Sequence, residues 1–188
     1  MAKSIRAFIA LELPENIIDV IRKIQEAMKS FGFKVRWVRP ENIHLTLKFL
    51  GNINPADVAQ ISSVICEAVN PFEPILLTAK GIGVFPGMKR PRVIWVGMGG
   101  QVATIIGLQK VLDEKLNGIG FPMEKRPFKG HLTLGRVKGR ISSERLTAAL
   151  AQHNEFESDT FFAQTVVLFQ SVLDPKGSVY TKLLNVSL

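Results

Sequence analysis

The sequence predicts an α+β fold with largely antiparallel sheets, arranged as two lobes related by a pseudo-twofold axis. Strand-like and helix-like segments follow one another without the strict alternation that a parallel sheet requires. A short motif occurs twice, each time in a predicted strand that is followed by a predicted helix. The 188 residues are 46% hydrophobic, which is enough to bury a substantial core. We therefore expect one bilobal domain over residues 1–188.

Periodicity predicts the elements of the first half of the chain. Apolar and β-branched residues cluster in three short runs that predict strands, at residues 5–11, 34–38 and 44–50. The apolar residues between Glu15 and Met28 recur with the spacing of one helical face, which predicts an amphipathic helix. Asn54 followed by Pro55 is a typical N-cap and N1 pair, so a second helix is expected to run to about Val69.

The second half of the chain continues the same mixture. The pattern predicts strands at residues 75–79, 92–98, 131–137, 160–173 and 179–186, and helices at residues 102–116 and 143–153. A loop rich in glycine, proline and basic residues is expected at residues 81–91, and a turn at residues 174–177. No linker separates independent domains.

The charge balance indicates a polyanionic partner. The chain carries 24 Lys and Arg against 16 Asp and Glu, a formal net charge of +8, and such an excess favours nucleic acid. Two basic groups could form the phosphate-binding walls of an RNA groove, and for their members outside the repeated motif scattered solvated charge is an equal alternative. They are Lys89, Arg90 and Arg92, and Lys125, Arg126, Lys129, Arg136, Lys138 and Arg140.

Several other classes of protein do not fit the sequence. The single cysteine, Cys66, allows no disulfide within the chain and falls in a helical pattern. The apolar run at residues 7–11 is short and is followed at once by Glu12, unlike a signal peptide. No apolar stretch is long enough to span a bilayer, and the three histidines are not at zinc-ligand spacing. We expect a cytoplasmic protein that binds neither a membrane nor a metal ion.

The repeated motif is the strongest functional signal. Residues 39–47 (RPENIHLTL) and 126–134 (RPFKGHLTL) share Arg, Pro, His, Leu, Thr and Leu in register. Because side chains alternate along a strand, His and Thr of each copy point one way and the two Leu the other. If the leucines anchor the core, His44 and Thr46 face a cleft together with His131 and Thr133.

Two opposed imidazoles suit attack at phosphorus, where entering and leaving oxygens lie on opposite sides of the transferred group. One imidazole can deprotonate water while the other protonates the departing alkoxide, and the threonine hydroxyls can donate to the phosphate oxygens. Arg136 would add a cation on the same face only if its strand has a bulge or ends. The competing interpretation is an old duplication that keeps these residues for packing alone.

Together these segments resemble the two-histidine (2H) phosphoesterase superfamily, in particular its RNA 2′,3′-cyclic phosphodiesterases, also called 2′-5′ RNA ligases. The resemblance covers nearly the whole chain, and its segments occur in the family's order and spacing. They are residues 6–10 (RAFIA), 36–40 (RWVRP), 44–51 (HLTLKFLG), 91–97 (PRVIWVG), 126–128 (RPF) and 131–136 (HLTLGR).

The resemblance implies a bilobal fold with helices on the outer faces of the sheets and a V-shaped groove between the lobes. It implies hydrolysis of RNA 2′,3′-cyclic phosphate ends to 2′-phosphomonoesters, without cofactor or metal. His44 would protonate the departing 3′ oxygen and His131 would activate the water, while Thr46, Thr133 and Arg136 would hold the phosphate.

The expected partners are RNA ends or nucleotide 2′,3′-cyclic phosphates, and we expect a monomer. Two alternative functions stay open at this point. One is a 2′-5′ RNA ligase acting on cleaved tRNA halves, and the other is a non-catalytic RNA-binding module that uses the basic cleft alone.

Overall fold

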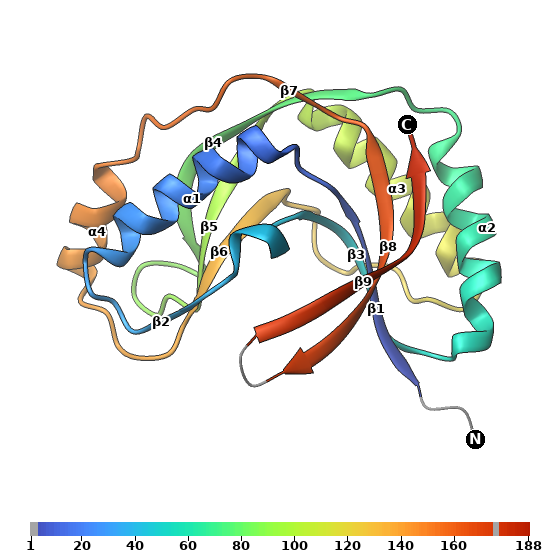
Figure 1. Ribbon diagram of the computed structural model, residues 1–188, viewed down its shortest axis with the longest axis horizontal. Coiled ribbons are helices and arrows are strands. Elements are labelled where there is room, and N and C mark those ends of the chain that lie inside the picture. Colours follow the sequence, from blue (N-terminus) through green and yellow to red (C-terminus); the bar gives the residue numbers. More distant parts are fainter. Residues whose placement is uncertain (1–3, 175–176) are drawn as a thin grey trace.

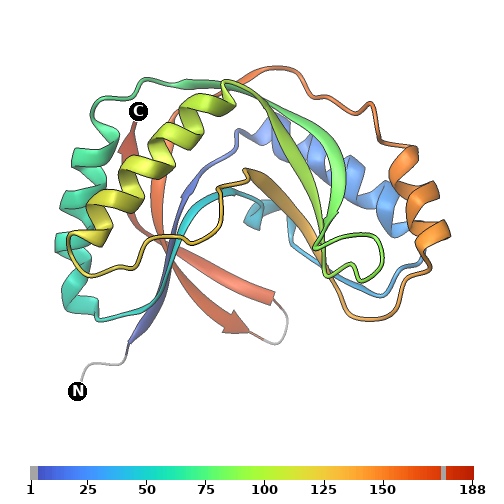
Figure 2. The same ribbon diagram turned by 180° about the vertical axis from the view of Figure 1, so that it is seen from behind.

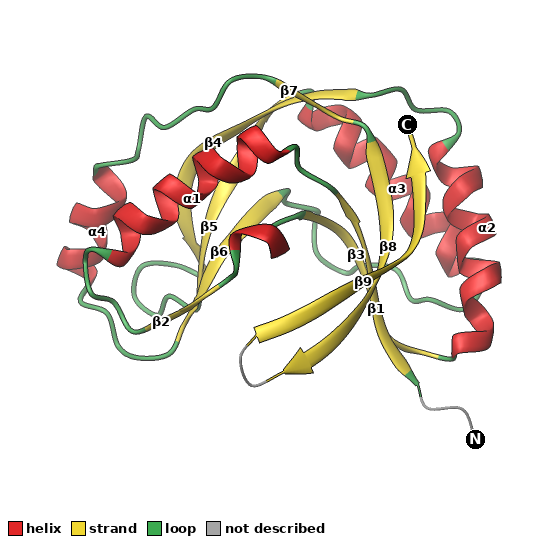
Figure 3. Ribbon diagram, viewed as in Figure 1, coloured by secondary structure: helices red, strands yellow, loops and turns green. Residues whose placement is uncertain are grey.

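The computed structural model describes residues 4–174 and 177–188, and over these ranges it consists of one curled antiparallel sheet with helices outside it (Figure 1; Figure 3). The strands are β1 (Ile5–Leu11), β2 (Val35–Trp37), β3 (Leu45–Ile53), β4 (Ile75–Phe85), β5 (Val93–Gly100), β6 (His131–Val137), β7 (Phe161–Ala163), β8 (Thr165–Asp174) and β9 (Gly177–Ser187). The helices are α1 (Glu15–Lys29), α2 (Val58–Val69), α3 (Val102–Asn117) and α4 (Ser143–Ala151), with short 3-10 turns η1 (Pro40–Asn42) and η2 (Pro55–Asp57). The predicted α+β class is confirmed.

The sheet has a narrow joint in its middle. Its strand order is β7-β4-β5-β6-β3-β1-β8-β9, with β2 paired to the other edge of β6. Between β3 and β6 the register consists of one pair, Leu45 with Leu132. We call β3, β1, β8 and β9 the first half-sheet, and β7, β4, β5, β6 and β2 the second half-sheet. Each half-sheet therefore contains one copy of the repeated motif, and the two copies meet at the joint.

The helices cover the outer faces of the sheet, and α1 and α3 each lie against the half-sheet that does not contain the strand before them. Helix α1 follows β1 but lies with α4 against the second half-sheet, whereas α2 and α3 lie against the first (Figure 1; Figure 2). The buried side chain of Gln25 on α1 donates to the carbonyl of Val38 at 2.6 Å and to that of Leu134 at 2.9 Å. Val38 directly follows β2 and Leu134 belongs to β6, so the amide fixes α1 to β6, which carries the second motif, and to its neighbour β2.

Two apolar layers lie on opposite faces of the first half-sheet. Along β1 the side chains of Ala7, Ile9 and Leu11 join the main core under the helices, which is continuous across both half-sheets. Phe8 and Ala10 alternate to the other face and form a smaller cluster with Val167 and Phe169. This smaller cluster has no helix over it in the described chain, and it forms part of the floor of the candidate site.

Most predicted elements are present, but some boundaries were wrong. The strand predicted at residues 44–50 continues to Ile53, and the strand predicted at residues 75–79 continues to Phe85. In both cases a glycine with positive φ, Gly51 at 74° and Gly81 at 64°, lets the strand pass through an irregularity instead of ending. The helix predicted from residue 143 to 153 ends at Ala151. In the predicted turn, residues 175 and 176 lie outside the described residues.

Candidate active site

A cavity of about 420 Å³ lies where the two half-sheets meet. Its walls come from β1, β3, β8 and β9 of the first half-sheet and from β2 and β6 of the second. Of the residues predicted from the sequence, His44, Thr46, Thr133 and Arg136 line it. His131 does not line the cavity itself.

The register at the joint shows where His131 lies. Leu45 pairs with Leu132 in an antiparallel arrangement, so continuing that register by one residue sets Thr133 opposite His44 and Thr46 opposite His131. Residues opposite one another share a face of the sheet, and diagonal neighbours lie about 7–8 Å apart. Continued in this way, the register sets His131 beside Thr46, which lines the cavity, and diagonal to His44.

Both histidine rings are held in the same orientation. The Nδ1 atom of His44 lies 2.8 Å from the carbonyl oxygen of Asn42, and that of His131 lies 2.7 Å from the carbonyl oxygen of Lys129. A carbonyl can only accept, so Nδ1 must carry the proton in each ring. In the neutral form Nε2 is then left as a proton acceptor, and in the charged form as a donor.

The two rings differ in their surroundings. His44 stacks on Phe8 at a centroid distance of 4.7 Å and an interplanar angle of 26°, and Tyr180 meets its ring edge-on at 5.4 Å. Phe169 completes this aromatic enclosure at 6.0 Å. Burial lowers the pKa of His44 to about 4, against the hydrogen bond to Asn42, which raises it.

His131 has an aromatic wall and two cations nearby. Phe85 approaches its ring edge-on at 5.0 Å, and Trp95 at 6.5 Å. The ammonium group of Lys129 lies 5.3 Å from the Phe85 ring and 5.0 Å from the Trp95 ring. Burial is the largest cause that lowers the pKa of His131; the hydrogen bond to the Lys129 carbonyl opposes it, and the charges of Arg136 and Lys129 lower it further.

A β-bulge occurs at the same place in both motif copies. In β3 the partners of Thr46 and Lys48 on β1 are adjacent, which leaves Leu47 as the extra residue. In β6 the partners of Thr133 and Gly135 on β5 are adjacent, which leaves Leu134 as the extra residue. Each bulge shifts the alternation by one. Arg136 was expected on the face of His131 only if its strand had a bulge, and the bulge is present. Phe49, which also comes five residues after the histidine of its motif copy, lines the cavity as Arg136 does.

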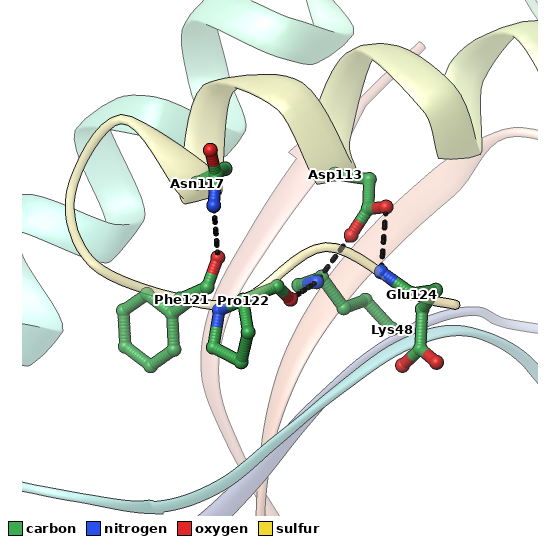
Figure 4. A network of polar contacts seen from close by, with 6 residues as sticks. All are labelled: Lys48, Asp113, Asn117, Phe121, Pro122 and Glu124. Carbon is green, nitrogen blue, oxygen red and sulfur yellow. Dashed lines mark hydrogen bonds and ion pairs between the residues drawn. The ribbon is translucent and has the colours of Figure 1, made fainter.

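The bulge in β3 also turns Lys48 away from the cavity and into the core. Its ammonium group pairs with Asp113 of α3 and donates to the carbonyl of Pro122 at 2.8 Å, while the second Asp113 oxygen accepts from the backbone N–H of Glu124 at 2.9 Å (Figure 4). Both side chains of the ion pair are almost fully buried. The pair fixes the segment that follows α3, and this segment leads to the second motif.

Sequence reasoning missed three arginines of the cavity. Arg6, Arg36 and Arg39 line it together with Arg136, and none of the described lining residues is acidic. Arg36 lies directly opposite Arg136 across β2 and β6. These arginines fall within the segments that resemble the family, and Arg39 also belongs to the repeated motif, but no periodicity distinguishes them from other exposed cations. The cavity is thus suited to an anion.

Two further observations bear on the predicted classes. In residues 4–174 and 177–188, no group of three His, Cys, Asp or Glu side chains is placed to hold a metal ion. No helix among the described residues has both the length and the apolar character needed to cross a membrane.

Comparisons with known proteins agree with the repeat and show the family of the chain. The model of the LigT-like phosphoesterase family matches residues 11–95 and 97–180, two consecutive segments that each contain one motif. The RNA 2′,3′-cyclic phosphodiesterase of Methanothermobacter thermautotrophicus is 35% identical over 94% of this chain and 95% of its own. That of Methanocaldococcus jannaschii is 35% identical over 93% of this chain and 96% of its own.

The fold has solved counterparts as well. The crystal structure of TT0787 of Thermus thermophilus superposes with a TM-score of 0.78 and 26% sequence identity, covering 97% of both chains. The matched segments, the identity along nearly the whole length and the shared architecture show the family that the sequence resembles. The chain belongs to the LigT-like family of 2H phosphoesterases.

Proposed function

We propose that this protein hydrolyses RNA 2′,3′-cyclic phosphate ends to 2′-phosphomonoesters by metal-independent acid–base catalysis, as a cytoplasmic monomer. The observation that carries the proposal is the paired orientation of the two imidazoles. His44 and His131 hold Nδ1 on a backbone carbonyl in the same way and lie diagonally across one joint of the sheet. Relatives that match over nearly the whole chain bear the name RNA 2′,3′-cyclic phosphodiesterase.

In the proposed reaction each histidine moves one proton. A water oxygen attacks phosphorus, and Nε2 of His131 takes the proton of that water. The bond from phosphorus to the ribose 3′ oxygen breaks, and Nε2 of His44 gives its proton to that oxygen. The phosphate stays on the 2′ oxygen, and the proton held by His131 returns to solvent before the next turnover.

The surroundings of the two rings are consistent with these roles. Burial and, to a smaller extent, the charges of Arg136 and Lys129 lower the pKa of His131, which keeps Nε2 available as a base. His44 has a pKa of about 4 in the free protein and must gain a proton to act as the acid. A bound phosphodiester anion favours the imidazolium, so we expect substrate binding to supply the condition for protonation.

The remaining polar groups suit the phosphate. Thr46 and Thr133 lie opposite the two histidines on the same face, where their hydroxyl groups can donate to the non-bridging oxygens. The guanidinium of Arg136, returned to this face by the bulge, can bind two of those oxygens at once.

The direct test uses an oligonucleotide with a 2′,3′-cyclic phosphate end, in ¹⁸O-labelled water, with and without EDTA. We expect a 2′-phosphate that contains one ¹⁸O atom, an unchanged rate in EDTA and a bell-shaped pH dependence of kcat/KM. Loss of activity on chelation, or a 3′-phosphate product, contradicts the mechanism. Binding without turnover indicates the RNA-binding module, and joining to an added 5′-hydroxyl RNA in preference to hydrolysis indicates the ligase.

A further inference from the structure

Four basic side chains form a ladder across β2 and β6 that begins at the cavity and leads away from it. Arg36 pairs with Arg136, and continuing this register by two residues places Lys34 opposite Lys138. The backbone N–H of Lys138 donates to the carbonyl of Lys34 at 2.8 Å, which confirms that the two chains still run together there. Continuing the alternation of β2 and β6 by one residue puts Lys34 and Lys138 on the same face as Arg36 and Arg136. We call Lys34, Arg36, Arg136 and Lys138 the basic ladder.

The described residues provide no carboxylate partner for the charges of the basic ladder. All four side chains are exposed, and none forms an ion pair with a carboxylate in the described part of the chain. Residues 33–39 and 136–140 contain no Asp or Glu. Like charges placed directly opposite one another destabilise a sheet, so two successive pairs of this kind point to an external anion.

More cations continue the ladder at its far end. The backbone N–H of Val137 donates to the carbonyl of Arg92 at 2.9 Å, which holds the loop between β4 and β5 beside β6. This loop carries the exposed Lys89 and Arg90. Exposed cations therefore occur at the cavity, on β2 and β6 with the residues next to them, and on the loop that lies beside the end of β6.

We propose that the basic ladder binds the backbone phosphates of the RNA strand on the 5′ side of the cyclic end. This inference rests on the proposed function, because it takes the cavity as the place of the terminal phosphate. Arg36 and Arg136 line that cavity, whereas Lys34 and Lys138 lie beyond it. Successive pairs are about 6.6 Å apart along the strands and present paired cations to one side, which suits a phosphate chain running along β2 and β6. The preferred substrate is then an oligonucleotide.

The test compares a short and a long substrate in a double variant, Lys34→Gln with Lys138→Gln. Neither lysine lines the cavity, so kcat/KM for a nucleoside 2′,3′-cyclic monophosphate should not change. For a hexanucleotide with a 2′,3′-cyclic end, kcat/KM should fall roughly fivefold to tenfold at low salt, since each lost cation removes a modest surface contact. The slope of log kcat/KM against log salt should become shallower by about 1.4, because each single-strand phosphate contact adds about 0.7.

A matched control separates this effect from the loss of net charge. The double variant Lys23→Gln with Lys110→Gln removes the same charge from exposed positions on α1 and α3, and it should leave both substrates and the salt slope unchanged. Equal losses in the two double variants overturn the proposal. So does an unchanged hexanucleotide rate in the ladder variant, which is the result expected if the face binds an acidic protein.

Binding measurements keep this inference separate from the proposed function. The probe is a fluorescein-labelled hexanucleotide that ends in a 2′-phosphate, and its Kd is measured by anisotropy. If the wild-type protein fails to hydrolyse either cyclic substrate, the proposed function fails. The basic ladder still stands or falls by whether the lysine double variant weakens this Kd about fivefold while the control does not.

Discussion

The two motif copies begin alike and diverge after the bulge. Both place His and Thr toward the cavity and both bulge at the second leucine. At the next position the first copy has Lys48, which enters the core and pairs with Asp113, and the second has Gly135. At the following position Phe49 faces the cavity in one copy and Arg136 in the other. The comparison shows that the same β-bulge directs an aromatic side chain into the cavity from the first half-sheet and a cationic one from the second.

The space that a side chain of residue 135 would need is occupied by side chains of β2. A Cβ atom at this position would lie 2.5 Å from Cγ1 of Val35 and 3.0 Å from Cε3 of Trp37. Among the described strands of the first half-sheet, none pairs with β3 as β2 pairs with β6, and there Lys48 reaches Asp113. One added strand thus accounts both for the glycine and for the pairing of Arg36 with Arg136.

The largest expected effect tests whether the two histidines are equal partners. His44→Asn and His131→Asn should each lower kcat on a nucleoside 2′,3′-cyclic monophosphate by about a hundredfold or more, because each removes one proton transfer. His153→Asn, outside both motifs, is the control and should leave kcat within twofold. A loss at only one of the two motif histidines would mean that the second is kept for packing.

The next effect concerns Lys48, which has no counterpart in the second copy. Lys48→Met should lower the free energy of unfolding by about 3–5 kcal/mol, since it leaves Asp113 buried without its partner. The double variant Lys48→Met with Asp113→Leu should recover most of this loss in urea denaturation. If the single and double variants are equally unstable, the fixed position of the segment after α3, rather than the buried charge, determines the stability.

The pH dependence of the free energy of unfolding tests the aromatic enclosure of His44. The pKa of His44 is about 4 in the folded protein against 6.5 in the unfolded chain, so the unfolded state binds the proton first as the pH falls. Stability is complete above pH 6.5 and is lost toward pH 4, with a loss of about 2 kcal/mol between pH 7.5 and 5. His44→Asn should flatten the unfolding curve over that range. An unchanged pH dependence in this variant would show that the aromatic enclosure does not disfavour the charged ring.

The smallest effect tests the like-charge pair, which is found beside the second motif only. Arg36→Gln should raise the free energy of unfolding by about 0.5 kcal/mol because it relieves repulsion across β2 and β6. The same variant should weaken binding of inorganic phosphate, measured by calorimetry. Arg22→Gln on α1, whose side chain pairs with Asp19, is the control and should not stabilise the protein.

The sequence was most informative where a pattern repeats. The two RPxxxHLTL segments predict the histidines, the threonines and the bilobal arrangement, and local hydrophobic patterns predict β1 and β6 at their observed bounds. The chain length predicts a single domain, and the positive net charge favours a polyanionic partner. These features depend on local spacing, which is visible in a single chain.

What the sequence could not show depends on pairing between distant segments. Nothing near Leu47 or Leu134 marks a bulge, because a bulge is a mismatch in length between two strands. The crossing of α1 to the second half-sheet and the opposition of Arg36 to Arg136 likewise appear only when β2 is placed beside β6. For that reason strand alternation alone supports Arg136 only conditionally, its assignment otherwise rests on the family resemblance, and Arg36 is missed.

The central place of β1 has a consequence for how the protein is made. This strand is translated before the other described strands, yet Arg6 pairs with Ser171 of β8, which is translated much later. Until β8 has been synthesised, one long edge of β1 has no hydrogen-bonding partner, and such an edge can pair with other nascent chains. Ser171 and Tyr180, which complete the cavity wall, also arrive last. Both histidines are therefore translated well before the protein has an enclosed pocket, and a chain that stops short of β8 has the motif residues but lacks this wall.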